Sequence, residues 1–184
     1  LGERTRPAKA PPRMTLDEFG SAIDFDESRR LMVETQLVSR GIRAPSVIAA
    51  MGTVPREVFI PTDRRISAYR DGALPIGHGQ TISQPFMVAA MTEALLPPKL
   101  IKGPGLLGRV LEVGCGSGYQ AAILAEIAEE VVTIERIPAL ADKAQGVLTA
   151  LGYDNVEVVV GDGTLGYEER APYDGILVAA GAPS

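Results

Sequence analysis

The chain has 184 residues, a formal net charge of −5, one cysteine and one histidine. Its apolar content of 46% is enough to bury a core and excludes wholesale disorder. The acidic balance argues against a nucleic-acid partner. A lone cysteine excludes an intramolecular disulfide and, beside a lone histidine, leaves no basis for a metal site. No apolar run reaches the ~18 residues of a membrane span, and the N-terminus lacks the apolar segment of a signal peptide. We therefore expect a cytoplasmic protein without a membrane partner.

The N-terminal half is expected to be helical. Residues 1–26 begin with "LGERTRPAKAPPR", a proline-rich and basic stretch that predicts a flexible arm. The pattern over residues 25–42 predicts a helix that Gly41 ends. Its expected apolar face holds Leu31, Thr35 and Val38, with Met32 and Leu37 nearby.

Residues 44–54 predict a second short helix, and residues 55–61, bounded by prolines, predict a loop or a short extended segment. Glycine and proline interrupt residues 69–83, which predicts a long loop. A loop of that length is uncommon inside a compact domain unless it binds something, although it could be only a connector. An apolar helix is expected over residues 86–96, where two prolines close it.

The C-terminal half alternates short apolar, β-branched runs with helical stretches. This order predicts βαβ units and a parallel sheet. We therefore expect an α/β protein with a Rossmann-like fold, in which residues 101–184 form a mostly parallel sheet with flanking helices and residues 27–100 form an N-terminal helical cap. The expected strands are residues 108–114, 130–135, 156–163 and 173–183, and the expected helices are residues 117–128 and 137–152.

The stretch "LEVGCGSGYQ", residues 111–120, joins the first expected strand to its helix. It holds Gly114, Gly116 and Gly118, with Glu112 ahead of them. Glycines here permit a close approach of a ligand to the backbone, although a tight turn alone would also explain them. The dinucleotide pattern G-x-G-x-x-G places a helix N-terminus against a pyrophosphate. The pattern here is E-x-G-x-G-x-G, which resembles that of class I S-adenosylmethionine-dependent methyltransferases.

Two carboxylates follow the next two strands. Glu135 ends the second expected strand, where a carboxylate can accept hydrogen bonds from both ribose hydroxyls. Asp162, in "GDGT", follows the third strand and could accept from an adenine amino group. Taken alone, Glu135 could be a solvated strand end and Asp162 a turn former. Because ligands of open α/β sheets bind at the carboxyl ends of the strands, we expect both carboxylates and the glycines to share one ligand.

Four longer stretches resemble the protein-L-isoaspartate O-methyltransferase family over about residues 27–184. They are "ALPIGHGQTISQPFMVAAMTEALL", "VLEVGCGSGYQAAILAEIAEEVVTIERIPALA", "LGYDNVEVVVGDGTLGY" and "APYDGILVAAGAP". The piece "GQTISQP" is distinguishing, because other methyltransferases share only the glycine loop. The resemblance implies methyl transfer from S-adenosylmethionine, with S-adenosylhomocysteine as product, to the free α-carboxylate of L-isoaspartyl residues in damaged proteins. The ester then closes to a succinimide, whose opening returns some normal aspartate.

The resemblance also implies roles for individual residues. The carboxylate nucleophile is already ionised at neutral pH, so the reaction needs positioning and no general base. Hydroxyl and amide donors suit such an anion, and Ser83 is the expected catalytic residue, although it could equally cap the following helix. We expect no catalytic role for His78 or Cys115 and no metal. The expected substrate-binding residues are Thr81, Ile82, Ser83 and Gln84, and the expected cofactor-binding residues are Glu112, Gly114, Cys115, Gly116, Gly118, Glu135, Arg136, Asp162 and Gly163.

The family's sequence continues past "VAAGAP" with a helix, a "GG" turn and further strands, whereas this chain ends at Ser184. We therefore expect the fourth strand to be an exposed edge and leave the activity of this polypeptide open. Three alternatives remain: a methyltransferase of another acceptor, a non-catalytic nucleotide-binding module and an NAD-dependent oxidoreductase. The first does not explain "GQTISQP", and the last does not fit the glycine spacing.

Overall fold

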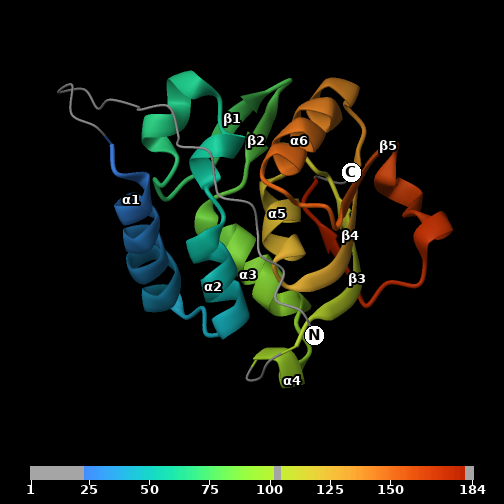
Figure 1. The fold of residues 1–184 in the computed structure, drawn as a ribbon, viewed down its shortest axis with the longest axis horizontal. Helices are drawn as coiled ribbons and strands as arrows, with labels where there is room; N and C mark the ends of the chain where they lie inside the picture. Colours follow the sequence, from blue (N-terminus) through green and yellow to red (C-terminus); the bar gives the residue numbers. More distant parts are fainter. Residues whose placement is uncertain (1–22, 102–104, 181–184) are drawn as a thin grey trace.

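The computed structural model describes residues 23–101 and 105–180. In this part of the chain, four parallel strands form one sheet in the order β5–β4–β3–β6. Helices α5 and α6 connect strands in sequence and pack on one face of the sheet (Figure 1). The expected Rossmann-like α/β fold is therefore confirmed. The strands are β3 (Leu107–Val113), β4 (Ala128–Glu135), β5 (Val156–Val160) and β6 (Gly175–Val178), and the helices are α5 (Tyr119–Ala125) and α6 (Pro138–Ala150).

The centre of the sheet is buried on both faces, which explains the nearly continuous apolar runs of β3 and β4. Successive side chains of a strand point to opposite faces. Val110 and Val131 join the main core on the side of the helices. Leu111 and Val132, one residue along, join a smaller cluster on the other side. Tyr167, from the connection between β5 and β6, packs against that cluster.

The N-terminal region is a helical cap to one side of the sheet (Figure 1). Helix α1 (Phe25–Met32) is capped by Asp24, whose Oδ1 accepts a hydrogen bond from the Glu27 amide at 3.0 Å. The helix continues through a π turn (Val33–Leu37) and a 3-10 turn (Val38–Arg40). Residues 1–22 of the expected arm lie outside the described residues, and α1 has begun before residue 26.

The buried face of this helix differs from the expected one. Leu31 and Val38 are 43% and 39% exposed, whereas Leu37 is buried. Arg29 also lies on the buried face, where its Nε donates to Tyr69 Oη at 2.9 Å. The expected face was wrong because a hydrogen-bonded arginine occupies a core position and because the π turn shifts the helical phase by about one residue.

Two segments between α2 (Pro45–Thr53) and α3 (Pro85–Leu95) also differ from expectation. The segment expected to be a loop or extended contains a 3-10 turn, η3 (Arg56–Phe59). The expected long loop contains an antiparallel hairpin, whose strands the glycines and prolines of the sequence conceal. His78 lies at its turn with a φ of 52°. The hairpin strands are β1 (Leu74–Gly77) and β2 (Gln80–Ile82), and the remaining elements of this half are η4 (Thr62–Ser67) and α4 (Pro98–Ile101).

Strand β6 is an edge of the described sheet, as expected. Ile176 and Val178 on this strand are each 57% exposed. Of the longer strand expected over residues 173–183, residues 181–183 lie outside the described part of the chain. No helix within residues 23–101 or 105–180 combines the length and the apolar character that a membrane span needs.

Replacement by alanine is predicted to change stability in opposite directions at two glycines, one just before α5 and one inside α6. Gly118 has a φ of 87°, and a Cβ there would lie 3.2 Å from the Ala144 Cβ. Gly118→Ala should lower the free energy of unfolding by about 1–2 kcal/mol. Gly146 is exposed inside α6, and a Cβ there would meet no atom within 4 Å, so Gly146→Ala should raise it by about 0.5–1 kcal/mol. Urea denaturation measures both changes. Equal stabilities of Gly118→Ala and the wild type would contradict the described backbone conformation at Gly118.

Candidate functional site

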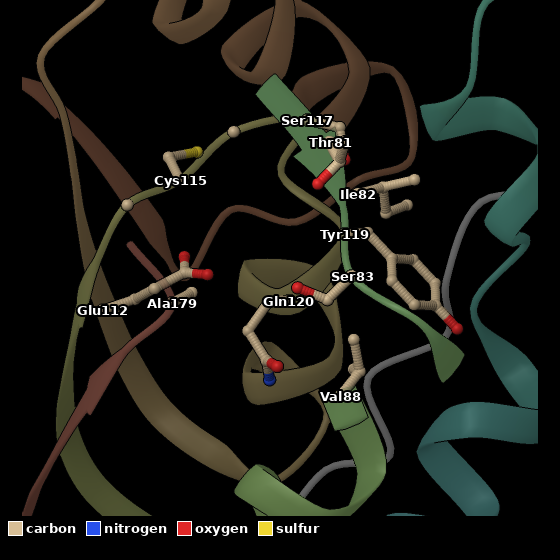
Figure 2. Close-up of a pocket in the computed structure, with 12 residues that line it drawn as sticks. Thr81, Ile82, Ser83, Val88, Glu112, Cys115, Ser117, Tyr119, Gln120 and Ala179 are labelled. Atoms are coloured by element: carbon tan, nitrogen blue, oxygen red, sulfur yellow. The ribbon is translucent and has the colours of Figure 1, made fainter. Parts of the chain in front are cut away.

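A pocket opens at the carboxyl end of β3, beside the glycine loop formed by residues 114–118 (Figure 2). Its empty space, which includes open solvent at the mouth, is about 320 Å³. The sheet order reverses between β3 and β6 at this point, and open α/β sheets bind ligands at such a switch. The structure brings together seven of the residues expected at the site, which are Thr81, Ile82, Ser83, Glu112, Gly114, Cys115 and Gly116.

Glu112 is the buried carboxylate of this pocket. It is the register partner of Thr133 across β3 and β4, and the Thr133 hydroxyl donates to Glu112 Oε2 at 2.5 Å. The residue is 0% exposed, and its Oε1 has no hydrogen-bond partner in the described part of the chain. A buried oxygen without a donor is costly. Oε1 is therefore free to bind a ligand group, and it is an acceptor when the carboxyl is ionised.

The surroundings of Glu112 favour its protonated form. Burial raises its pKa to about 8, the hydrogen bond from Thr133 opposes the rise, and the nearby charge of Glu135 adds to it. A cationic group in the pocket would favour the ionised carboxylate. Binding of a cation and loss of the Glu112 proton are therefore coupled.

Gln120 provides a second acceptor, which was not predicted from the sequence. The Thr92 hydroxyl donates to Val88 O at 2.7 Å, so it can only accept from Gln120 Nε2, at 2.9 Å. This bond orients the amide and leaves Gln120 Oε1 buried without a partner among the described residues. Gln120 and Glu112 both reach into the pocket (Figure 2). The available signal was one amide side chain in the otherwise apolar start of helix "YQAAILA".

The glycine loop is fixed by the strand next to it. Ile134 O, on β4, accepts hydrogen bonds from Gly114 N at 2.9 Å and from Cys115 N at 3.1 Å. Gly114 has a φ of 97°, and a Cβ there would lie only 2.8 Å from the Ala180 Cβ. No larger residue fits this position without a shift of the backbone.

Glu135 lies outside the pocket lining and connects to it through the loop. Its Oε2 accepts from Gly116 N at 2.8 Å, and its Oε1 accepts from Ile137 N at 3.0 Å. A carboxylate has about four acceptor sites, so each oxygen retains capacity for a further donor. Glu135 can hold the glycine loop and still accept from a ligand.

Asp162 and Gly163 follow β5 at the same edge of the sheet. Asp162 Oδ1 accepts from Thr164 N at 3.0 Å, and this bond, with a smaller contribution from the charge of Arg136, lowers the pKa of the exposed carboxyl. A Cβ on Gly163 would lie 2.6 Å from a methyl of Val113, at the end of β3. The two segments therefore touch, although Asp162, Gly163 and Arg136 do not line the pocket.

Three of the four expected substrate-binding residues form one wall. Thr81, Ile82 and Ser83 line the pocket, and the Ser83 hydroxyl points into it (Figure 2). The alternative role of Ser83 as a helix cap is wrong, because the N-cap of α3 is the next residue and makes no side-chain capping bond. Gln84 turns away, and its amide donates to Asp71 Oδ1 at 2.7 Å.

Neither His78 nor Cys115 has the setting of a reactive group. His78 is exposed at the hairpin turn. Burial raises the pKa of the Cys115 thiol, and the nearby Glu112 adds to the rise, so the sulfur stays protonated at neutral pH. Among the residues that the structure describes, no group of three or more histidine, cysteine and acidic side chains could hold a metal ion.

Comparison with known proteins identifies the family. The family model for protein-L-isoaspartate(D-aspartate) O-methyltransferase matches residues 27–184. The chain belongs to this family. It is 56% identical over 161 residues to the protein-L-isoaspartate O-methyltransferase of Synechococcus sp. (strain JA-2-3B'a(2-13)). It is 58% identical over 162 residues to protein-L-isoaspartate O-methyltransferase 1 of Rhodopseudomonas palustris (strain HaA2).

These alignments cover most of this chain but only part of the relatives. They include 87% and 88% of the chain and 63% of each relative, so the chain spans less than two thirds of their length. A solved protein-L-isoaspartate O-methyltransferase structure shares the fold with a TM-score of 0.70 and 30% identity, over 83% of this chain and 48% of that one. The expected family resemblance is confirmed.

Glu112→Gln is predicted to change how stability depends on pH. The folded-state pKa of about 8 lies above the ordinary glutamate value near ~4.3, so between these values the folded chain holds a proton that the unfolded chain has released. The free energy of unfolding of the wild type should therefore fall as the pH rises from about 5 through about 8. The glutamine variant lacks this titration and should show a flatter profile in urea denaturation.

Glu129→Gln is the matched control, because Glu129 is exposed on β4, the strand that also carries Thr133. Its profile should follow that of the wild type. Parallel profiles for Glu112→Gln and the wild type would show that Glu112 is ionised in the folded chain.

Proposed function

We propose that this chain forms the catalytic part of an enzyme that transfers a methyl group from S-adenosylmethionine to the α-carboxylate of L-isoaspartyl residues in damaged proteins, the step that starts their repair. The observation that carries the proposal is the pocket that joins the "GQTISQP" segment to the glycine loop. Thr81 and Ser83 line one side of it, and Gly114 and Gly116 line the other. The names of relatives that share more than half of the aligned residues support it.

The residues present fit S-adenosylmethionine. Its α-ammonium group would find two buried acceptors, Glu112 Oε1 and Gln120 Oε1, which otherwise have no partner in the described chain. Glu135 would accept from the ribose hydroxyls with the capacity that its two amide bonds leave. Asp162 and Gly163 would lie on the adenine side. Further proposed contacts are Cys115, Gly118 and Arg136.

The role of the protein in the reaction would be to position the reacting groups. When bound, S-adenosylmethionine supplies the methyl group on a sulfonium that is a good leaving group. An α-carboxylate with a pKa near ~3.5 is ionised at neutral pH, so no general base is needed. The Ser83 hydroxyl and amide groups of the same segment would hold the carboxylate, without a direct ion pair that would weaken the nucleophile. Alignment of the carboxylate with the methyl group would then accelerate methyl transfer.

The two halves of the chain would divide this task. Residues 27–100 would supply the substrate wall, residues 101–184 would supply the cofactor groups, and residues 1–26 would lie outside both. The proposed partners are proteins and peptides that contain L-isoaspartyl residues, with no nucleic-acid or membrane partner. The proposed compartment is the cytoplasm, and the buried, unpaired Cys115 supports a reducing environment.

Glu112→Gln should weaken the binding of S-adenosylhomocysteine at least about 10-fold, or about 1.4 kcal/mol. The glutamine carbonyl can keep the hydrogen bond from Thr133, so its amide N–H groups would replace the acceptor that faces the ammonium group. Isothermal titration calorimetry at pH values near the pKa of about 8 measures the change. Glu129→Gln should bind like the wild type, and equal affinities of all three proteins would remove Glu112 from the cofactor site.

Methyl transfer to an isoaspartyl peptide, beside the same peptide with normal aspartate, tests the function itself. Label from S-adenosylmethionine should enter only the isoaspartyl peptide. Ser83→Ala should lower kcat at least about 10-fold, because it removes a hydrogen-bond donor to the reacting group, and should leave S-adenosylhomocysteine affinity within about threefold.

Each alternative has its own outcome in these measurements. Equal labelling of both peptides, or labelling of neither with turnover on a small molecule, would indicate another acceptor. Stabilisation by S-adenosylhomocysteine without any turnover would indicate a nucleotide-binding module. Stabilisation by NAD and not by S-adenosylhomocysteine would indicate an oxidoreductase.

A further inference from the structure

Arg56 is completely buried, at 0% exposed, where three parts of the chain meet. Its Nε donates to Ala68 O at 2.8 Å, and its Nη2 donates to Ser83 O at 2.7 Å. Its guanidinium carbon lies 4.8 Å from the centre of the Tyr119 ring. Tyr119 begins α5 directly after the glycine loop and lines the pocket, as Ser83 does. Arg56 therefore contacts both sides of the pocket from behind.

Core packing alone does not explain an arginine at this position. Its partners in the described chain are two carbonyl oxygens and the ring and hydroxyl of Tyr119, none of which is an ionised carboxylate, and its Nη1 has no hydrogen-bond partner there. Burial lowers the pKa of Arg56, yet a guanidinium keeps its proton in proteins. A buried cation without an opposite charge is costly, and an apolar side chain of similar volume would avoid that cost.

The shape of the guanidinium provides the explanation. It is planar, and its donors have fixed directions, so two bonds to Ala68 O and Ser83 O set the separation of these carbonyls. Contact with the Tyr119 ring sets the plane of the group against α5. Ser83 needs such a tether, because it follows a strand of three residues, β2, whose only sheet partner among the described residues is β1.

We propose that Arg56 is a positioning residue that holds Ser83, and with it the substrate wall, at a fixed distance from the glycine loop. The inference rests on the proposed function, because it takes Ser83 as the residue that faces the acceptor carboxylate. The bond from a cation to Ser83 O also polarises the peptide group, which strengthens the Gln84 N–H as a donor. Arg56 thus acts on the anion's binding wall without forming an ion pair with the anion.

Arg40 offers a matched control on the outer side of the same segment. Its Nη1 lies 3.1 Å from Asp71 Oδ2, and Asp71 accepts from the Gln84 amide. Its guanidinium carbon lies 3.8 Å from the centre of the Phe86 ring. The Arg40 side chain is 40% exposed, so solvent weakens its ion pair. Arg40→Lys makes the same chemical change near Ser83 without touching the Ser83 carbonyl.

Arg56→Lys keeps the positive charge and removes the planar guanidinium. One ammonium group cannot donate to both carbonyls in the same geometry. We expect kcat on the isoaspartyl peptide to fall at least about 10-fold, with a smaller change in KM and S-adenosylhomocysteine affinity within about threefold. Amide hydrogen exchange should become faster in residues 82–84 and stay unchanged in β3 and β4. Arg40→Lys should match the wild type in all four measurements.

Equal behaviour of Arg56→Lys and Arg40→Lys would overturn the proposal. Faster exchange throughout the core with a lower melting temperature would also overturn it, because it would show a purely structural role. Should the wild type label no isoaspartyl peptide while it binds S-adenosylhomocysteine, the proposed function fails, and the exchange at residues 82–84 still decides whether Arg56 holds this segment.

A measurement on the wild type covers the case in which Arg56→Lys does not fold. The Nη2–H resonance of Arg56 should shift when the isoaspartyl peptide binds to the protein with S-adenosylhomocysteine, because Nη2 donates to Ser83 O and the peptide would bind the segment that carries this carbonyl. The aspartyl peptide should leave it in place. An unchanged resonance with bound isoaspartyl peptide would overturn the proposal.

Discussion

The buried hydrogen bond from Thr133 to Glu112 is the interaction on which the site depends. The two residues are register partners across β3 and β4, so the bond forms only in this alignment, and a slip by one residue would turn one side chain to the opposite face. The same register places Ile134 O beneath the glycine loop. It also ends β4 at Glu135, whose carboxylate accepts from Gly116 N. The arrangement of Glu112, the glycine loop and Glu135 is therefore a consequence of strand pairing.

The wall of the pocket that carries Ser83 is built by different means. Ser83 follows a two-stranded hairpin outside the main sheet, so few ladder hydrogen bonds define its place. A side chain from a separate segment reaches it, since Arg56 donates to the Ser83 carbonyl from the buried side. One half of the pocket is thus set by a backbone ladder, and the other half is set by long-range polar contacts.

This difference explains how much of the molecule could be predicted from the sequence. The apolar runs predicted all four parallel strands, although β3 lies one residue earlier than expected, β4 begins two residues earlier and β5 ends three residues earlier. Because the ends of parallel strands share an edge, the sequence also predicted that Glu135 lies at the glycine loop. Gln120 and Arg56 were missed because their roles depend on distant partners, Thr92 O–H and Ser83 O, that no local pattern contains. The predicted buried face of α1 was wrong for the same reason, since Arg29 is buried where it bonds to the distant Tyr69.

The raised pKa of Glu112 would make the binding of a cationic ligand an exchange of one positive charge for another. With a pKa raised to about 8, the free carboxyl favours its protonated form, and an ammonium group that bound beside it would release that proton to the solvent. The charge enclosed by the pocket is then the same before and after. The heat of association consequently includes the ionisation heat of the carboxyl and that of whichever buffer captures the proton. An enthalpy measured in one buffer therefore describes the buffer as well as the contacts, and two buffers are needed to separate them.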